Sequence, residues 1–218
     1  MLRAGDPQAA LPLCRQALDS DPGNADVLSM AGAAAFQSGL EEVALDLLQT
    51  AVTLAPGHAE AGNNLGNVLA AMGRDGEARA AYRAAIAADP GTADPWYNLA
   101  QLMERGGLNN EALDAYRHAA GLAPGHAGAL LGQGNAYKAL GRLEDARAAY
   151  TSALAMDPSS PEASTNLAAV LQELGDFEAA ADHCRRALEA APDMPEAHYN
   201  LGIALQEMGD FEDAIDAY

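Results

Sequence analysis

Prolines recur at a fixed interval along the chain, and their spacing restricts the possible folds more than any other feature. Six of the eleven prolines follow one another every 34 residues: Pro22, Pro56, Pro90, Pro124, Pro158 and Pro192. Self-similarity at a period of about 20 to 50 residues indicates a fold made of stacked copies of one small unit. We therefore expect one structural motif to repeat along the whole chain.

Taking each of these prolines as repeat position 32 divides the sequence into copies of equal length. Five copies are complete, and a partial copy lies at each end: 1–24, 25–58, 59–92, 93–126, 127–160, 161–194 and 195–218. Together the copies occupy all 218 residues. The sequence therefore predicts a single solenoid over 1–218, with no length left for a catalytic domain.

Small residues occupy the same positions in every copy. Position 15 is glycine seven times: Gly5, Gly39, Gly73, Gly107, Gly141, Gly175 and Gly209. Glycine tolerates the left-handed backbone conformation that ends many helices. Alanine fills positions 20 and 27 of every copy that reaches them, and position 8 is always glycine or alanine. Such residues let two helices approach closely, because no large side chain separates their backbones.

Each copy therefore predicts an antiparallel pair of helices. Helix A is expected over positions 1–14 and helix B over about positions 17–30, with the glycine turn between them. Larger apolar residues recur at position 7 (leucine) and at position 24 (leucine or tyrosine). Position 34 offers Asn24, Thr92 and Ser160 as caps for the next helix A.

This pattern resembles the tetratricopeptide repeat family over the whole chain. The clearest copy has the family's residues at the family's spacing: Trp96, Leu99, Ala100, Ala112, Tyr116, Ala119 and Pro124. The resemblance implies an all-α fold, a right-handed superhelical solenoid of antiparallel helix pairs with the A helices on its concave face. It also implies a protein–protein interaction scaffold that binds an extended peptide or a partner protein along that face.

The charge of the chain restricts its partners. It has 31 acidic and 12 basic residues, which gives a net charge of −19. Such a surface repels phosphate backbones and anionic lipid, so neither nucleic acid nor a membrane surface is an expected partner. A neutral or basic peptide fits better than an acidic one. Alternatively, the acidity only keeps an open solenoid soluble. No signal-peptide or membrane-span pattern occurs, and a cytoplasmic location is the default expectation.

No residue pattern indicates catalysis, a metal site or a cofactor. The five histidines show no metal-ligand spacing, and the glycine-rich segments 62–67 and 132–135 fall inside expected A helices rather than in phosphate-binding turns. Cys14 and Cys184 both take position 24, five copies apart, so they are expected to be buried and unpaired. The chain is therefore not predicted to be an enzyme.

The candidate site is a column of asparagines on helix A. Position 6 holds Asn64, Asn98, Asn166 and Asn200, and is interrupted by Met30 and Gly132. The family resemblance implies that positions 2, 5, 6, 9, 12 and 13 contact bound peptide. Four further residues at positions 9 and 5 would extend the site: Asn67, Asn135, Tyr97 and Tyr199.

Two roles for these asparagines stay open. A carboxamide both donates and accepts hydrogen bonds, so the column could bond to a peptide backbone whatever its side chains. Alternatively, the asparagines satisfy polar groups between adjacent A helices. Asparagines at this position, as in 64–67 and 199–202, also resemble the repeat region of O-linked N-acetylglucosamine transferases and their bacterial SPINDLY-like relatives. That second resemblance implies the substrate-presenting arm of a larger protein O-glycosyltransferase.

The first and last copies are interrupted within helices. Met1 enters at position 11 and Tyr218 stops at position 24. The last helix is expected to show an apolar stripe of Phe211, Ala214, Ile215 and Tyr218. We therefore expect either a fragment of a longer protein or end-to-end self-association through uncapped terminal helices.

Overall fold

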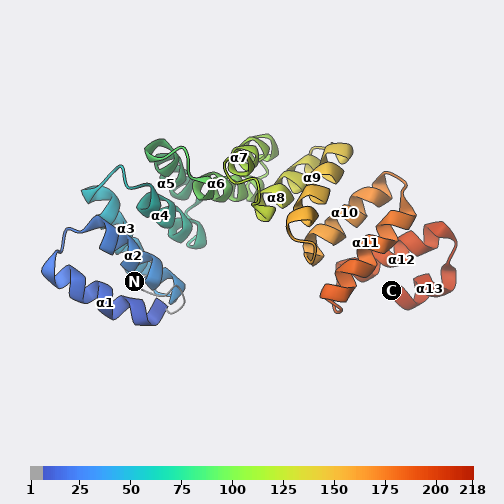
Figure 1. Ribbon diagram of the computed structural model, residues 1–218, viewed down its shortest axis with the longest axis horizontal. Coiled ribbons are helices and arrows are strands. Elements are labelled where there is room, and N and C mark those ends of the chain that lie inside the picture. The colour runs from blue at the N-terminus through green and yellow to red at the C-terminus, as the bar shows by residue number, and fades with distance from the viewer. Residues whose placement is uncertain (1–6) are drawn as a thin grey trace. The chain divides into compact units, whose positions relative to one another are not determined.

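The computed structural model describes residues 7–218 and confirms the all-α fold class (Figure 1). Over these residues the chain forms thirteen α-helices and no strand. Gly5, the first of the position-15 glycines, lies outside the described residues.

The helices alternate between types A and B. The A helices are α2 (Ala25–Gln37), α4 (Ala59–Ala71), α6 (Ala93–Arg105), α8 (Ala127–Ala139), α10 (Pro161–Glu173) and α12 (Pro195–Met208). The B helices are α1 (Pro7–Ser20), α3 (Glu41–Leu54), α5 (Asp75–Ala88), α7 (Asn109–Leu122), α9 (Leu143–Met156), α11 (Phe177–Ala190) and α13 (Phe211–Ala217). Every B helix of a complete copy spans positions 17–30, as predicted. The A helices end at position 13, one residue earlier than predicted, except for α12.

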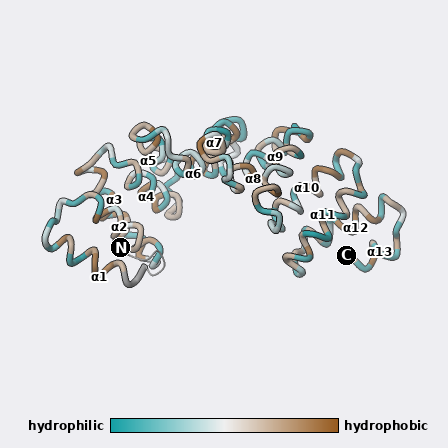
Figure 2. The backbone as a smooth tube through the Cα atoms, viewed as in Figure 1, coloured by the Kyte–Doolittle hydropathy of each residue, from teal (hydrophilic) through white to brown (hydrophobic). Residues whose placement is uncertain are grey.

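The chain divides into two compact units between Leu102 and Met103, inside α6. In the first unit, α2 packs on α3 and α4 packs on α5. In the second unit, the corresponding pairs are α8 with α9, α10 with α11 and α12 with α13. Neighbouring A helices also touch, α2 with α4, α8 with α10 and α10 with α12. Equivalent positions of successive A helices therefore lie side by side within each unit. Hydrophobic and hydrophilic residues alternate along the helices (Figure 2), because each helix buries only one face.

The position-15 glycines end the A helices as predicted. Their φ angles lie between 71° and 88° in the six described copies. No other residue type in the described part of the chain has a positive φ. This left-handed conformation is costly for residues with a Cβ atom, so the turn requires glycine.

The alanine columns form the contact between the two helices of a copy. From residue 25 on, the alanines at positions 20 and 27 are at most 3% exposed. Ala10 and Ala17 in the partial copy 1–24 are the exceptions, the former half-buried and the latter exposed. The large residues at position 24 fill the space beside these columns, since Leu48, Tyr82, Tyr116 and Tyr150 are all buried.

Glycine at position 8 makes room for the aromatic ring at position 24 of the same copy. A Cβ atom on Gly134 would lie 2.3 Å from the ring of Tyr150, and one on Gly66 would lie 2.4 Å from that of Tyr82. The fifth copy combines alanine at position 8 (Ala168) with a small residue, Cys184, at position 24. The copy 93–126 combines Ala100 with Tyr116, and there the ring lies against Gly132 of the next copy instead. Position 8 and a position-24 ring that stays over its own copy therefore share one limited volume.

Both cysteines are buried and carry free thiols, as predicted. Cys14 is 4% exposed and Cys184 is fully buried. Burial raises the pKa of the Cys14 thiol and raises that of Cys184 to about 11. A thiol with a raised pKa is a weak nucleophile at neutral pH, so packing accounts for both residues.

Two of the three predicted caps are confirmed, and the third is wrong. The side chains of Asn24 and Ser160 accept hydrogen bonds from backbone N–H groups three residues further on, at 3.1 and 3.2 Å. Thr92 instead donates to Asp89 through its hydroxyl, at 2.6 Å. The residue three positions after Thr92 is Pro95, which has no N–H to donate.

The predicted apolar stripe on the last helix is correct in part. Phe211, Ile215 and Tyr218 are 64%, 73% and 60% exposed. Ala214 is only 3% exposed, so its inclusion in the stripe was wrong. Its place in the position-20 alanine column puts it against α12 instead.

Candidate functional site

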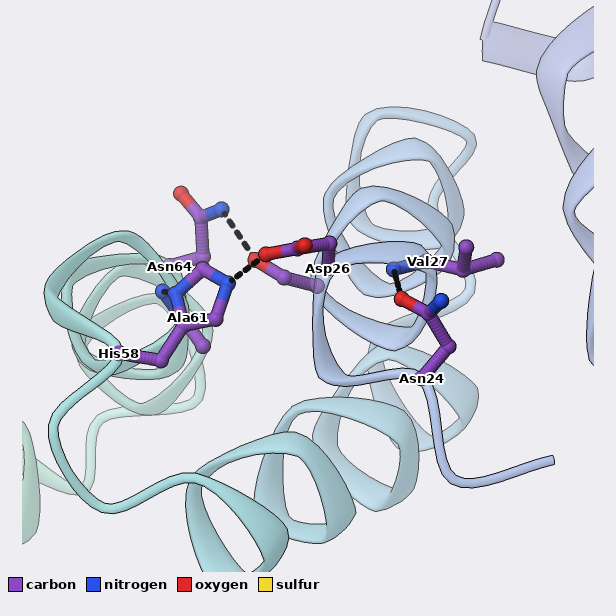
Figure 3. A network of polar contacts seen from close by, with 7 residues as sticks. Asn24, Asp26, Val27, His58, Ala61 and Asn64 are labelled. Carbon is purple, nitrogen blue, oxygen red and sulfur yellow. Dashed lines mark hydrogen bonds and ion pairs between the residues drawn. The ribbon is translucent and has the colours of Figure 1, made fainter. Parts of the chain in front are cut away.

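Three of the four position-6 asparagines link their A helix to the preceding one. In the first unit, the Asn64 amide nitrogen donates to the Ser29 hydroxyl at 3.4 Å, from α4 to α2 (Figure 3). The Asn98 amide nitrogen donates to the Asn63 carbonyl oxygen at 2.9 Å, from α6 to α4. Both acceptors occupy position 5 of the preceding copy. Ser29 and Asn63 were not predicted from the sequence as partners of the asparagines, although both occupy the same repeat position in the sequence.

The second unit makes the same kind of link through a different acceptor. Position 5 of the fourth copy is Leu131, which cannot accept a hydrogen bond. The Asn166 amide nitrogen donates instead to the side-chain oxygen of Asn135, one turn further along α8, at 3.1 Å. That oxygen also accepts from the Tyr150 hydroxyl at 2.8 Å. Asn135 therefore connects the asparagine column to the buried core.

These bonds give three of the four position-6 side chains a common orientation. In Asn64, Asn98 and Asn166, the amide nitrogen is engaged by the neighbouring A helix. Their carbonyl oxygens receive no hydrogen bond from residues 7–218, and none of these oxygens is buried from solvent. The Asn200 side chain also has no such bond, while its backbone carbonyl accepts from Gln172 at 2.5 Å. Each of the four thus presents a free, accessible acceptor.

The interruption of the column at Gly132 has a packing cause. A Cβ atom on Gly132 would lie 2.3 Å from the ring of Tyr116, which belongs to the preceding copy. The Tyr116 hydroxyl donates to Glu104 at 2.5 Å. No side chain can occupy position 6 while the ring is there, so asparagine is excluded.

The remaining predicted site residues differ in exposure. Tyr199 is 60% exposed, and its ring centre lies 6.0 Å from that of Tyr218. Tyr97 is half-buried, and its hydroxyl accepts from Gln101 at 2.9 Å. Asn67 accepts from the buried Tyr82 hydroxyl at 2.8 Å, as Asn135 does from Tyr150. The position-9 asparagines therefore have a structural partner that the sequence did not indicate.

Two histidines have a capping role that sequence reasoning missed. His58 accepts from the Ala61 N–H at 3.1 Å through Nδ1, and its Nε2 lies 2.8 Å from an Asp26 oxygen (Figure 3). His126 caps α8 in the same way, accepting from Ala129 at 3.1 Å. Because Nδ1 accepts, Nε2 carries the proton, and His58 donates to Asp26. His58 thereby ties the start of α4 to the start of α2.

The pKa shifts of two other titratable groups arise mainly from burial. Burial raises the pKa of Tyr150, and the nearby carboxylates of Glu104 and Glu162 raise it further. Burial lowers the pKa of His183, whose Nδ1 is buried without a hydrogen-bond partner. Among residues 7–218, no three His, Cys, Asp or Glu side chains come together as a metal site would require. None of the described helices is both long enough and apolar enough to cross a membrane.

The stacked A and B helices, with a row of accessible amides on the A helices, define a helical-repeat scaffold of the kind that mediates protein–protein interaction. The chain belongs to the tetratricopeptide repeat family. One tetratricopeptide repeat model matches residues 2–59, 131–195 and 170–218, and two more match residues 66–107 and 93–126. Proteins built of these repeats are generally non-catalytic scaffolds that bind peptides or proteins. No curated protein matches the sequence.

Solved structures share the fold. YrrB, described as a TPR protein with an unusual peptide-binding site, is 21% identical with a TM-score of 0.71, over 84% of this chain and 95% of that chain. MamA is 28% identical with a TM-score of 0.64, over 71% and 90%. The pilF protein of Pseudomonas aeruginosa is 18% identical with a TM-score of 0.79, over 88% of each chain.

Proposed function

We propose that this chain is a protein-interaction scaffold that binds an extended peptide along its A helices. The asparagine strip, which we define as the position-6 residues Asn64 and Asn98 in the first unit and Asn166 and Asn200 in the second, would contact the peptide backbone within each unit. The observation that carries this proposal is the free side-chain oxygen of all four residues, which three of them hold in a common orientation. In Asn64, Asn98 and Asn166 the amide nitrogen bonds within the protein, and the oxygen stays free to accept from peptide N–H groups.

The two roles left open by the sequence are compatible in this geometry. The bond from the amide nitrogen of Asn64, Asn98 and Asn166 to the neighbouring A helix holds each of these side chains in one rotamer. A fixed acceptor loses less conformational entropy when a ligand binds than a freely rotating one. The inter-helix bonds would thus preorganise the strip for peptide rather than compete with it.

The surrounding charges favour a neutral or basic peptide. At position 2 the A helices of the second unit carry Glu162 and Glu196, and at position 13 they carry Glu173 and Glu207. All four are exposed. An acidic peptide would be repelled here, whereas a basic peptide would associate faster at low salt. Peptide binding on a similar fold has a precedent in YrrB and its peptide-binding site.

The test is a double variant in the second unit, Asn166→Ala with Asn200→Ala. Peptides of unrelated sequence should all bind more weakly, by a similar factor of roughly 10 to 30, because two hydrogen bonds of about 1 kcal/mol each are lost. Fluorescence anisotropy with labelled peptides measures this, and chemical denaturation checks that folding is retained.

Asn110→Ala is the matched control, since Asn110 is exposed on a B helix outside these columns. It should leave every affinity unchanged. A loss confined to one peptide sequence would refute backbone recognition, and unchanged affinities for all peptides would refute the strip as the binding site.

A second candidate function is the substrate-presenting arm of a protein O-glycosyltransferase. It is favoured by the asparagines at position 6 and by the segments 64–67 and 199–202 that accompany them. The gene sequence downstream of the codon for Tyr218 tests it directly. A glycosyltransferase domain there would support the arm, and a polar capping helix would favour the free-standing scaffold.

A further inference from the structure

A small cavity lies in the second unit, between the starts of α8 and α10 and the end of α9. Its volume is about 170 Å³. The apolar part of its lining includes Leu131, Ala153 and Ala163, and Asp157 and Ser160 supply its polar part. A cavity of roughly 150 Å³ can hold a group the size of benzene. This one is therefore large enough for one side chain of a bound partner.

The cavity adjoins a break in the position-2 column. Every other copy that reaches position 2 has an acidic residue there: Asp26, Glu60, Asp94, Glu162 and Glu196. The fourth copy has Gly128, which lines the cavity. With no side chain on Gly128, this part of the α8 surface is left uncovered. The missing side chain beside the cavity is thus specific to this copy.

The cavity also shares a helix face with the asparagine column. Gly128, Leu131 and Asn135 are spaced i, i+3 and i+7 along α8, so they lie on one side of it. Asn135 in turn accepts from Asn166, a member of the asparagine strip, across the α8–α10 contact. A peptide that bonds to Asn166 would therefore run close to the mouth of the cavity.

The polar part of the lining is acidic and has a free acceptor. Oδ1 of Asp157 accepts from the backbone N–H and the hydroxyl of Ser159, at 3.2 and 2.9 Å. Its Oδ2 atom makes no hydrogen bond or ion pair with any described residue. The sequence from residue 151 to the end has fourteen acidic residues and only two basic ones, Arg185 and Arg186. An apolar cavity with one free carboxylate oxygen matches an amphipathic cation.

We propose that this cavity binds the side chain of a lysine in the peptide held by the asparagine strip. The four-carbon stem lies against Leu131, Ala153 and Ala163, and the ammonium group donates to Oδ2 of Asp157. The assignment rests on the proposed peptide-binding function and adds a side-chain preference to it. Recognition of the backbone would then set general affinity, and this cavity would set the register of the peptide.

The test compares two labelled nonapeptides of glycine, serine and alanine that differ only at the central residue. One has lysine there, and the other has norleucine, which keeps the stem but lacks the ammonium group. The lysine peptide should bind about tenfold more tightly, because a charge-assisted hydrogen bond is gained. In the protein, the Gly128 amide signal should shift in NMR spectra when the lysine peptide is added.

Two isosteric variants separate the cavity from general attraction. Asp157→Asn keeps an acceptor for Ser159 but removes the charge, and it should abolish the preference for lysine. Glu178→Gln removes one charge from the exposed surface of α11, away from the cavity, and should leave the preference intact. If both variants reduce the preference equally, general electrostatics explains it and the assignment is wrong.

The remaining outcomes distinguish a failure of the lysine cavity from a failure of the proposed peptide-binding function. Equal binding of the two nonapeptides to the unaltered protein would overturn the lysine cavity and leave the backbone-binding function standing. Failure of both peptides to bind would overturn the proposed function, and the lysine cavity with it.

Discussion

Replacing Tyr150 by alanine is expected to cost about 3–5 kcal/mol of unfolding free energy, the largest loss we predict for a single substitution. The Tyr150 side chain is fully buried in the core of the second unit, against Gly134. Its removal leaves a cavity between α8 and α9 and also removes the hydroxyl that donates to Asn135. Chemical denaturation followed by circular dichroism measures the loss.

Two controls divide this loss into its parts. Tyr150→Phe removes only the hydroxyl and should cost about 1 kcal/mol, the typical value of one hydrogen bond. Tyr199→Ala removes the same side chain from a position that is 60% exposed, and should change stability by no more than about 0.5 kcal/mol. A cost for Tyr150→Ala as small as that for Tyr199→Ala would contradict the packing described above.

Replacing Gly134 by alanine should destabilise the second unit by about 1–3 kcal/mol. Intrinsic helix propensity predicts the opposite, since alanine is favoured over glycine inside a helix by about 1 kcal/mol. Packing should prevail because the new Cβ atom would lie 2.3 Å from the Tyr150 ring. Gly121→Ala is the matched control on α7, where a Cβ atom meets nothing within 4 Å, and it should be neutral or stabilising.

A double variant tests whether the two positions share one volume. In the fifth copy, Ala168 at position 8 occurs with Cys184 at position 24. Gly134→Ala should therefore cost much less when Tyr150→Cys is also present, giving a coupling of about 0.5–3 kcal/mol in the double-mutant cycle. Strictly additive effects would show that the ring and the glycine are not the source of the strain.

The helices were predictable because their signals are local and repeated. Glycine at position 15, alanine at positions 20 and 27 and proline at position 32 each fix a backbone conformation or a close approach of two helices. Repetition in five or more copies removes the ambiguity that any one of them would have. The B helices accordingly begin and end where the pattern placed them.

The incorrect predictions concern residues whose role depends on a neighbour in space. Thr92 fails as a cap because Pro95 lacks the required N–H, and His58 succeeds as one although histidine is not a favoured capping residue. Gly132 breaks the asparagine column because the ring of Tyr116 leans over it from the preceding copy. A repeat position describes what the copies have in common, so it does not predict the orientation of the aromatic ring in one particular copy.

The candidate site was predictable as a column but not as a hydrogen-bond network. Spacing alone places Asn64, Asn98, Asn166 and Asn200 at equivalent positions, whatever they contact. Their inter-helix bonds depend on which residue of the preceding copy can accept, Asn63 in one case and Asn135 in another. The free carbonyl oxygens therefore became apparent only from the structure. Their role as peptide acceptors stays a prediction.

One measurement tests recognition of the peptide backbone most directly. A labelled peptide is compared with a version in which a single backbone N–H near the strip is replaced by an ester oxygen, against the protein with and without Asn166→Ala. The ester should weaken binding to the unaltered protein by about five- to tenfold, since one hydrogen bond is lost. It should cause no further loss in the Asn166→Ala variant. Equal affinity of amide and ester peptides at every position along the strip would contradict the account.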